Sequence, residues 1–270
     1  MVKNIFLLGS TGSIGDSTLK ILKKNKKKFN IKLLSTNENV EKIFNQAIEF
    51  NVKQVVIFNK QKYLKYNQRF KKKRIKVFFN IKDALRNKKR KVFLTINAIS
   101  GIDGLEPTLD VIKFSNNIAI ANKESIICGW KFIKKELTKN KTDFIPLDSE
   151  HFSIWSLLRN ENYKNIKKIY LTASGGPFLN KKLNEIKNIK SKYALRHPNW
   201  KMGKKISIDS ATLMNKVFEI IEAQRIFNIN INKFKILIHP SSYIHSIIKF
   251  FNGQIKILAH ETDMKIPIFN

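Results

Sequence analysis

The sequence predicts an α/β protein in two parts, with a parallel sheet and crossover helices first and an α+β domain second. In the first half, short runs of aliphatic residues alternate with helical stretches, which is the pattern of a parallel sheet. Three glycines, Gly9, Gly12 and Gly15, follow the first of these runs. The last part instead has consecutive strands and a hairpin signal at Asn252-Gly253.

We expect the first strand at residues 3–8 and a helix from Gly15 to about Lys26. The elements expected next are strand 31–35, helix 40–50, strands 54–58, 77–79 and 92–96 with helices between them, strand 118–120 as the last of the sheet, and a long helix from 124 to about 137. A polar run at 139–143 marks a boundary, so we predict domains at residues 1–145 and 146–270. The elements expected in the second are strand 167–172, a loop from His197, a helix starting near Ser207 or Asp209, and strands 234–239, 243–250 and 254–259.

The charge of the chain is strongly basic, with 52 Lys+Arg against 20 Asp+Glu and a net charge of +32. Such a charge suits a nucleic-acid-binding protein or reflects a general bias toward lysine. The basic residues are scattered in short runs, with no zinc-finger spacing or aromatic-basic repeat. We therefore expect no specific nucleic-acid partner, although a polyanion will adhere at low salt.

Two further features bear on location. No run of apolar residues is long enough to span a membrane, and the short apolar stretch before Gly9 suits a strand better than a signal peptide. The single cysteine, Cys128, excludes an internal disulfide, which is compatible with a reducing cytoplasm. Because Cys128 lies in an apolar helical stretch, we interpret it as a core residue and not as a nucleophile.

The three early glycines predict a dinucleotide site. They follow a strand and open a helix, where a tight turn brings backbone N–H groups and the helix N-terminus close to a pyrophosphate. This context predicts a Rossmann-like N-terminal domain, although a plain glycine-rich turn is the alternative. Glu38, just past the second strand, would bind a ribose 2′-hydroxyl and so favour NAD over NADP.

Acidic residues in the second part predict a metal site. Asp148 and Glu150 flank Ser149, and two carboxylates at this spacing can share a hard cation with a third carboxylate. Glu219 is the natural third ligand. A ligand set made only of oxygen indicates Mg²⁺ or Mn²⁺ and not zinc. The alternative is that Asp148 only caps the start of a helix.

The segment from His197 to Glu219 predicts a phosphate site. One face of its helix carries polar side chains at spacings of three and four, namely Thr212, Asn215, Lys216 and Glu219, and another carries an apolar stripe of Met214, Val217 and Ile221. Hydroxyls, an amide and an ammonium near a helix start suit an anion. The Ser174-Gly175-Gly176 turn at a strand end suits one as well. An ordinary Lys216–Glu219 surface pair and a simple turn are the alternatives.

Six segments together resemble the 1-deoxy-D-xylulose 5-phosphate reductoisomerase family. They are GSTGSIG at 9–15, ANKES at 121–125, DSEH at 148–151, TASGGPF at 172–178, HPNWKMGKKISIDSATLMNK at 197–216 and IHPSSYIHS at 238–246. They run in the family's order across nearly the whole chain. The resemblance implies NADPH-dependent isomerisation and reduction of 1-deoxy-D-xylulose 5-phosphate to 2-C-methyl-D-erythritol 4-phosphate, a step of non-mevalonate isoprenoid biosynthesis. It also implies Mg²⁺ or Mn²⁺ on the substrate's hydroxyketone oxygens, retro-aldol and aldol steps before hydride transfer, and a homodimer.

The resemblance also implies the roles of individual residues. The implied metal ligands are Asp148, Glu150 and Glu219, and the implied catalytic residues are Lys123, Glu150, His197 and His245. The implied substrate contacts are Ser149, Ser174, His197, Trp200, Ser210, Asn215 and Lys216. The implied cofactor contacts are Gly9, Ser10, Thr11, Gly12, Ser13, Ile14, Gly15, Asn37, Asn39, Asn122, Lys123, Glu124, Met202 and Gly203. Trp200 and Met202 would belong to a flap with hinges at Pro198 and Gly203.

The sequence departs from the family pattern at several positions. Asn37 and Glu38 stand where a small and a basic residue are usual, which removes a partner of the cofactor's 2′-phosphate. Val217 replaces a glycine and Ser241 replaces a glutamine. The sequence ends at Asn270, before the family's helical C-terminal domain, and we expect the missing domain to leave apolar surface exposed. A truncated inactive remnant, or a basic nucleic-acid-binding protein, are the alternative functions.

Overall fold

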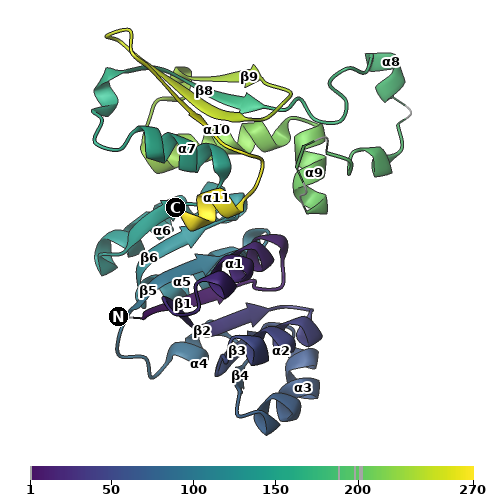
Figure 1. Cartoon of the computed structure of the whole chain (residues 1–270), viewed down its shortest axis with the longest axis vertical. Coiled ribbons are helices and arrows are strands. Elements are labelled where there is room, and N and C mark those ends of the chain that lie inside the picture. The colour runs from purple at the N-terminus through teal and green to yellow at the C-terminus, as the bar shows by residue number, and fades with distance from the viewer. Residues whose placement is uncertain (1, 188, 198, 201–202) are drawn as a thin grey trace. The chain divides into compact units, whose positions relative to one another are not determined.

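The computed structural model describes residues 2–187, 189–197, 199–200 and 203–270. The chain divides into two compact units, Met1–Leu147 and Asp148–Asn270, each with its own sheet (Figure 1). In the part of the chain that the structure describes, no helix is both long and apolar enough to cross a bilayer.

The first unit is a seven-stranded parallel sheet in the order β4-β3-β2-β1-β5-β6-β7, which confirms the predicted parallel sheet. Its strands are β1 (Lys3–Leu8), β2 (Phe29–Thr36), β3 (Gln54–Ile57), β4 (Lys76–Phe78), β5 (Val92–Asn97), β6 (Ser115–Ile120) and β7 (Asp143–Pro146). Its helices are α1 (Ser13–Lys24), α2 (Val40–Glu49), α3 (Lys60–Lys72), α4 (Ile81–Leu85), α5 (Leu105–Ile112) and α6 (Lys123–Asn140), with a short 3₁₀ turn η1 (Ile102–Gly104). The end of β1 is fully buried, because helices cover both faces of a parallel sheet, and this explains its continuous apolar run.

Two expectations for this unit are wrong. The strand at 118–120 is not the last of the sheet, because β7 pairs with β6 beyond it. This edge strand is short, starts at the exposed Asp143 and ends in a proline, so its sequence resembles a linker. An edge strand of a sheet tolerates proline. Cys128 is not a core residue, because it lies on the exposed side of α6, next to the buried Gly129.

The second unit is a four-stranded mixed sheet in the order β11-β10-β8-β9. Its strands are β8 (Ile166–Ala173), β9 (Phe234–Ile238), β10 (Ile244–Phe250) and β11 (Ile255–Ala259), and its helices are α7 (Ser149–Leu157), α8 (Leu183–Ile186), α9 (Lys204–Ala211), α10 (Met214–Phe227) and α11 (Lys265–Phe269), with 3₁₀ turns η2 (Tyr163–Asn165), η3 (Ser191–Tyr193) and η4 (Ile231–Lys233). β10 and β11 are antiparallel and meet at Gly253, whose φ is +88°, which confirms the predicted hairpin. Residues from α7 and α10, such as Ile154 and Ala223, pack on Ile169 and Ile248 of the sheet to form its core.

The predicted helix after Ser207 is two helices, α9 and α10. Leu213 between them has a φ of +59°, a left-handed conformation that ends α9 and that leucine rarely adopts. The Thr212 hydroxyl bonds back to the Ile208 carbonyl at 3.2 Å, so Thr212 closes α9 and does not share a face with Asn215 and Lys216. The predicted apolar stripe faces outward, with Met214 and Val217 both 42% exposed. The polar face of α10 is the buried one.

Candidate metal and phosphate site

The glycine loop of the first unit has the backbone of an anion-binding turn. Gly9 follows β1 with a φ of +70°, and a Cβ added there would lie 2.6 Å from the Ala98 carbonyl oxygen. A Cβ at Gly15 would lie 2.4 Å from the Ser10 carbonyl oxygen. Both positions therefore require glycine. Gly12 is the N-cap of α1 and offers no capping side chain, which leaves the first N–H groups of α1 available to an anion.

Several side chains that the resemblance assigns to the cofactor serve the fold of this unit. The Ser10 hydroxyl is buried and donates to Gln46 Oε1 at 2.8 Å, and Thr11 Oγ1 lies 2.8 Å from Thr36 Oγ1. Asn39 caps α2 by accepting from the Lys42 N–H. Asn122 caps α6 and donates to the Ile99 carbonyl. These bonds hold the glycine loop and the starts of α2 and α6 in place.

The remaining assignments in this region are placed as follows. Ser13, Ile14 and Gly15 form the first turn of α1, and Asn37 is exposed just after β2. Lys123 and Glu124 open α6, and Lys123 is buried. Gly203 is the N-cap of α9. Met202, the predicted flap methionine, lies outside the described residues.

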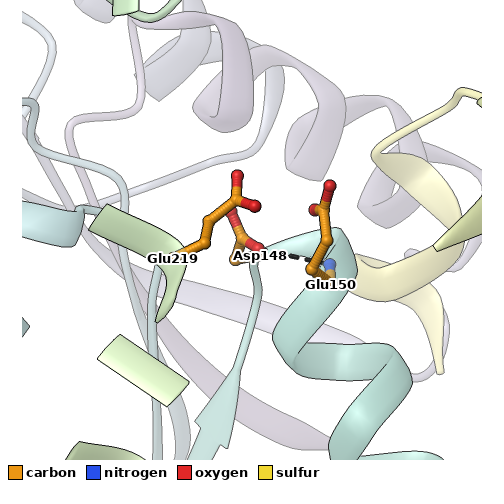
Figure 2. Close-up of side chains that lie close together, drawn as sticks. All are labelled: Asp148, Glu150 and Glu219. Atoms are coloured by element: carbon orange, nitrogen blue, oxygen red, sulfur yellow. Dashed lines mark hydrogen bonds between the residues drawn. The ribbon is translucent and has the colours of Figure 1, made fainter. Parts of the chain in front are cut away.

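In the second unit, the structure brings together the carboxylates of Asp148, Glu150 and Glu219 (Figure 2). One oxygen from each lies within 4.8 Å of the others. Asp148 is also the N-cap of α7 and accepts from the Glu150 N–H at 3.2 Å, so the capping alternative and the cluster hold at once. The cap fixes Asp148 beside Glu150 on the first turn of α7, and α10 carries Glu219 to them.

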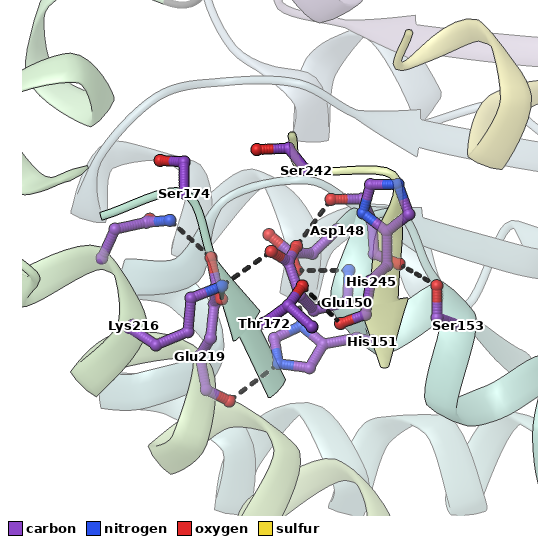
Figure 3. Close-up of polar contacts among 12 residues, drawn as sticks. Asp148, Glu150, His151, Ser153, Thr172, Ser174, Lys216, Glu219, Ser242 and His245 are labelled. Atoms are coloured by element: carbon purple, nitrogen blue, oxygen red, sulfur yellow. Dashed lines mark hydrogen bonds and ion pairs between the residues drawn. The ribbon is translucent and has the colours of Figure 1, made fainter. Parts of the chain in front are cut away.

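Lys216 lies among these carboxylates (Figure 3). Its ammonium is 2.7 Å from Glu150 Oε1 and also pairs with Glu219. Burial by itself lowers the pKa of Lys216, but the charges of Glu150 and Glu219 outweigh it and hold that pKa above the ordinary value. Lys216 is therefore charged at neutral pH. Since Lys216 is 4% exposed and Glu219 is 1% exposed, their pair is a buried ion pair and not the surface pair weighed from the sequence.

The donor set of the cluster fits a divalent cation. Three carboxylates face one ammonium, so the formal charge of the cluster is negative. Ligands about 2.1 Å from a Mg²⁺ ion lie roughly 3 to 4.2 Å from each other in octahedral geometry. The separation of up to 4.8 Å between carboxylate oxygens therefore needs only a small contraction. Oxygen ligands suit Mg²⁺ and Mn²⁺, and Asp148, Glu150 and Glu219 would hold the ion.

His151 supports the cluster from behind, and the sequence reasoning missed it. Its ring is buried, with Nε2 2.8 Å from the Glu219 carbonyl oxygen and Nδ1 3.4 Å from Asp148 Oδ1. One ring thus links α10 to the N-cap of α7, as groups that orient metal ligands do. Its position three residues after Asp148 on one helix is the signal that could have revealed it.

Ser174 and His197 form the second polar group of this unit. His197 Nδ1 accepts the backbone N–H groups of Asn199 and Trp200 at 3.1 and 3.0 Å, so in the neutral ring the proton sits on Nε2. Nε2 then donates to Ser174 Oγ at 3.0 Å, and the Gly176 N–H donates to the same oxygen at 3.1 Å. Burial lowers the pKa of His197, which favours this neutral form.

The other predicted phosphate ligands lie on α9 and α10. A Cβ at Gly176 would lie 2.9 Å from the Ser210 carbonyl oxygen, so glycine lets the turn after β8 approach α9 closely. Asn215 Nδ2 donates to Glu219 Oε1 at 2.5 Å. The Ser149 hydroxyl donates to Glu150 Oε2 at 2.6 Å. Asn215 and Ser149 therefore orient the carboxylate cluster.

Three rings stack near His245. The rings of His245 and His260 are stacked at 3.7 Å, and Trp200 meets His245 edge-on at 6.0 Å. His245 Nε2 lies 3.2 Å from the His260 carbonyl oxygen. Burial lowers the pKa of His245, although the charge of Glu150 acts in the opposite direction. His260 was not singled out from the sequence, because it lies in no recognisable pattern.

Family models and relatives agree on what this chain is similar to. A model of 1-deoxy-D-xylulose 5-phosphate reductoisomerase matches residues 5–129, and one of that enzyme's C-terminal domain matches residues 144–227. The reductoisomerase of Pelagibacter ubique is 57% identical over the whole chain, and that of Clostridium novyi is 40% identical over 99% of it. The chain spans 70% of the length of each of these relatives.

Solved structures give the same result. A DOX-P reductoisomerase in complex with NADPH, fosmidomycin and magnesium has a TM-score of 0.91 and 33% identity, covering 99% of this chain and 68% of that one. An archaeal homoserine dehydrogenase in complex with NADPH shares only the fold, with a TM-score of 0.64 and 12% identity. By the extent of these matches and the carboxylate cluster on its second sheet domain, the chain belongs to the 1-deoxy-D-xylulose 5-phosphate reductoisomerase family.

Proposed function

We propose that this chain is an active 1-deoxy-D-xylulose 5-phosphate reductoisomerase, which forms 2-C-methyl-D-erythritol 4-phosphate with NADPH and Mg²⁺ or Mn²⁺. The observation that carries the proposal is the convergence of Asp148, Glu150 and Glu219 beside Lys216 in one unit. The bound cation would polarise the substrate's hydroxyl and carbonyl oxygens as a Lewis acid. NADPH would supply the hydride.

The residues of the chain divide this work between them. Residues 1–145 would bind NADPH at the glycine loop and α1, and residues 146–270 would bind the metal and the substrate. Ser174, Ser210, Asn215 and Lys216 would hold the substrate phosphate, with His197 beside the substrate. Lys123 and Ser149 would contact the reacting oxygens, His245 would assist catalysis, and Trp200 would help to exclude water. Cytoplasmic location stays a prediction, supported by the single cysteine.

The decisive measurement is NADPH oxidation by the purified chain. We expect oxidation only when both 1-deoxy-D-xylulose 5-phosphate and Mg²⁺ or Mn²⁺ are present, with the product identified by mass spectrometry. Omitting either component is the control. No oxidation of either nicotinamide cofactor at saturating substrate would contradict the proposal. A remnant without a stable fold would also lack a cooperative melting transition that NADPH raises.

We further propose that the enzyme is a homodimer that pairs through the open face of the second sheet. Strand alternation and register put Tyr170, Leu237, Ile247, Ile255 and Ile257 on one face. The core packs on the opposite face, with Ile169 and Ile248. Ile255 and Ile257 are more than half exposed. The same register puts Lys168, Lys235 and Lys249 on this face, so its apolar residues are mixed with lysines. Exposed apolar residues gathered on one face of a sheet are typical of a protein interface.

Replacing Ile257 by Lys is expected to convert the dimer to a monomer. The change puts two buried charges into a symmetric interface and removes roughly 1.5–3 kcal/mol of burial per side chain. Light scattering at micromolar concentration would measure the mass. Leu64→Lys on α3, another exposed apolar residue, is the matched control and should leave the mass unchanged. A wild-type chain with the mass of one copy would refute the proposal.

A further inference from the structure

The edge of the first sheet where Glu38 lies presents a conflict of charge. An acidic residue just after the second strand of such a sheet binds the ribose 2′-hydroxyl of NAD, whereas NADP needs a cation there for its 2′-phosphate. Glu38 occupies this position, two residues after the end of β2. By itself, it would repel the cofactor that the proposed function requires.

Strand register places a second element beside Glu38. β2 and β3 are parallel neighbours, Thr36 pairs with Ile57, and the Phe58 N–H donates to the Thr36 carbonyl at 3.0 Å. Glu38 lies two residues after the end of β2, and Asn59 lies two residues after the end of β3. The glycine loop is at the same edge, since Thr11 Oγ1 lies 2.8 Å from Thr36 Oγ1.

The structure surrounds the Glu38 carboxylate with donors. Asn59 Nδ2 donates to Glu38 Oε1 at 2.7 Å, and Lys62 Nζ lies 2.6 Å from Glu38 Oε2. Lys62 Nζ also donates to the Glu38 carbonyl at 2.8 Å. The hydrogen bond from Lys62 is the largest cause that lowers the pKa of Glu38, and the bond from Asn59 acts in the same direction. Two oxygens of Glu38 thus hold the Lys62 ammonium at this edge of the sheet.

The position of Lys62 follows from the start of α3. Asn59 is the N-cap of α3 and accepts from the Lys62 N–H at 3.0 Å. The cap places Lys62 on the first turn of the helix, on the side of Glu38. The same Asn59 amide donates to Glu38, so one residue orders both members of the pair. Lys42, another lysine near the loop, is instead engaged with Asp16 and the Thr11 carbonyl.

The Lys62–Glu38 ion pair is weak enough for Lys62 to bind another anion. The Lys62 side chain is 37% exposed and that of Glu38 is 58% exposed, and exposed ion pairs of this kind contribute little stability. Lys62 can therefore exchange its partner at small cost. A phosphate monoester carries up to two negative charges and three acceptor oxygens, so it is a stronger partner for an ammonium than a single carboxylate.

We propose that Lys62 recognises the 2′-phosphate of NADPH, and that Glu38 holds Lys62 in place until the cofactor binds. The cation that selects NADPH then comes from α3 and not from the residues after β2. The inference rests on the proposed function, because it concerns the cofactor of that reaction. It predicts selectivity for a 2′-phosphate in every ligand that carries one, with or without the nicotinamide ring.

The test is binding, measured by calorimetry with NADPH, NADH, 2′,5′-ADP and 5′-AMP on the whole chain. Lys62→Met is expected to weaken the binding of NADPH and 2′,5′-ADP by about tenfold, which is the value of one charged hydrogen bond. The affinities for NADH and 5′-AMP should stay nearly unchanged. Glu38→Gln should tighten NADPH, because it removes the competing carboxylate. The matched control is Lys65→Met. Lys65 is an exposed lysine on the same helix, so this variant loses the same charge and should keep the wild-type selectivity.

Other outcomes would overturn the inference. If Lys62→Met lowered the affinity for all four ligands equally, or for none of them, Lys62 would be excluded as the selective contact. Weaker NADH binding with no gain for NADPH in Glu38→Gln would show that Glu38 binds the ribose hydroxyls. In both cases wild-type binding of NADPH would leave the proposed function intact, whereas a wild-type chain that binds no nicotinamide cofactor would remove both.

Discussion

Replacing Glu219 by Gln is expected to lower kcat by about a thousandfold or more. Changes to groups behind metal ligands alone cost roughly 10–100-fold, and Glu219 is one of three converging carboxylates. The substitution keeps the shape and the bond with Asn215 but removes the charge that a cation needs. The measurement is kcat with excess Mg²⁺ or Mn²⁺, together with Mn²⁺ affinity from paramagnetic resonance.

Glu222→Gln is the matched control for this prediction. Glu222 is a buried carboxylate one turn further along α10, with Oε2 3.8 Å from His151 Nδ1. It reaches the cluster through His151, so we expect a loss of about tenfold in metal affinity or activity. Unchanged Mn²⁺ affinity in Glu219→Gln, in a protein that melts like the wild type, would refute the assignment of Glu219 as a ligand.

Replacing Lys216 by Met is expected to tighten metal binding while it weakens the use of substrate. The Lys216 ammonium occupies the space between Glu150 and Glu219, so an incoming cation must compete with it. Its removal should lower the Kd for Mg²⁺ by about tenfold, the scale of a charged hydrogen bond. Loss of the proposed phosphate contact should lower kcat/KM for 1-deoxy-D-xylulose 5-phosphate by about a hundredfold.

Lys216→Met should change metal affinity and substrate use in opposite directions, which a general loss of structure would not do. Because lone buried carboxylates are costly, the variant should melt at a lower temperature without metal and gain more from Mg²⁺ than the wild type. Lys205→Met, which breaks the pair between the exposed Lys205 and the partly buried Asp209 on α9, is the control and should change neither constant. Weaker Mg²⁺ binding in Lys216→Met would mean that Lys216 assembles the site and does not compete for it.

The fold was predictable wherever hydrophobic period and turn chemistry agreed. The alternation of strands and helices gave the parallel sheet, and Asn252-Gly253 gave the hairpin between β10 and β11. The break between α9 and α10 was not predictable, because Leu213 carries no sequence signal of a left-handed residue. β7 was missed because an edge strand of four residues ending in proline has little pattern to detect.

The polar residues of the site were predictable as types but not in their arrangement. The spacing of Asp148 and Glu150 indicated a shared cation, yet only the packing of α10 on the second sheet shows that Lys216 and Glu219 face inward. The amphipathic pattern of α10 predicts that Met214 and Val217 face the core. In the structure the Lys216–Glu219 ion pair is buried instead, and both apolar residues face outward. Contacts such as His260 on His245 depend on a turn far along the chain, which periodicity does not report.

The bond between His197 and Ser174 has a consequence for inhibitor design. Ser174 Oγ accepts one proton from the imidazole and one from the Gly176 amide, so its own proton is what it can give to a ligand. Compounds that occupy the proposed phosphate site there should therefore carry oxygen acceptors, such as a phosphonate or sulfonate. Amidines and other donor-only groups would meet a hydroxyl whose lone pairs are already used.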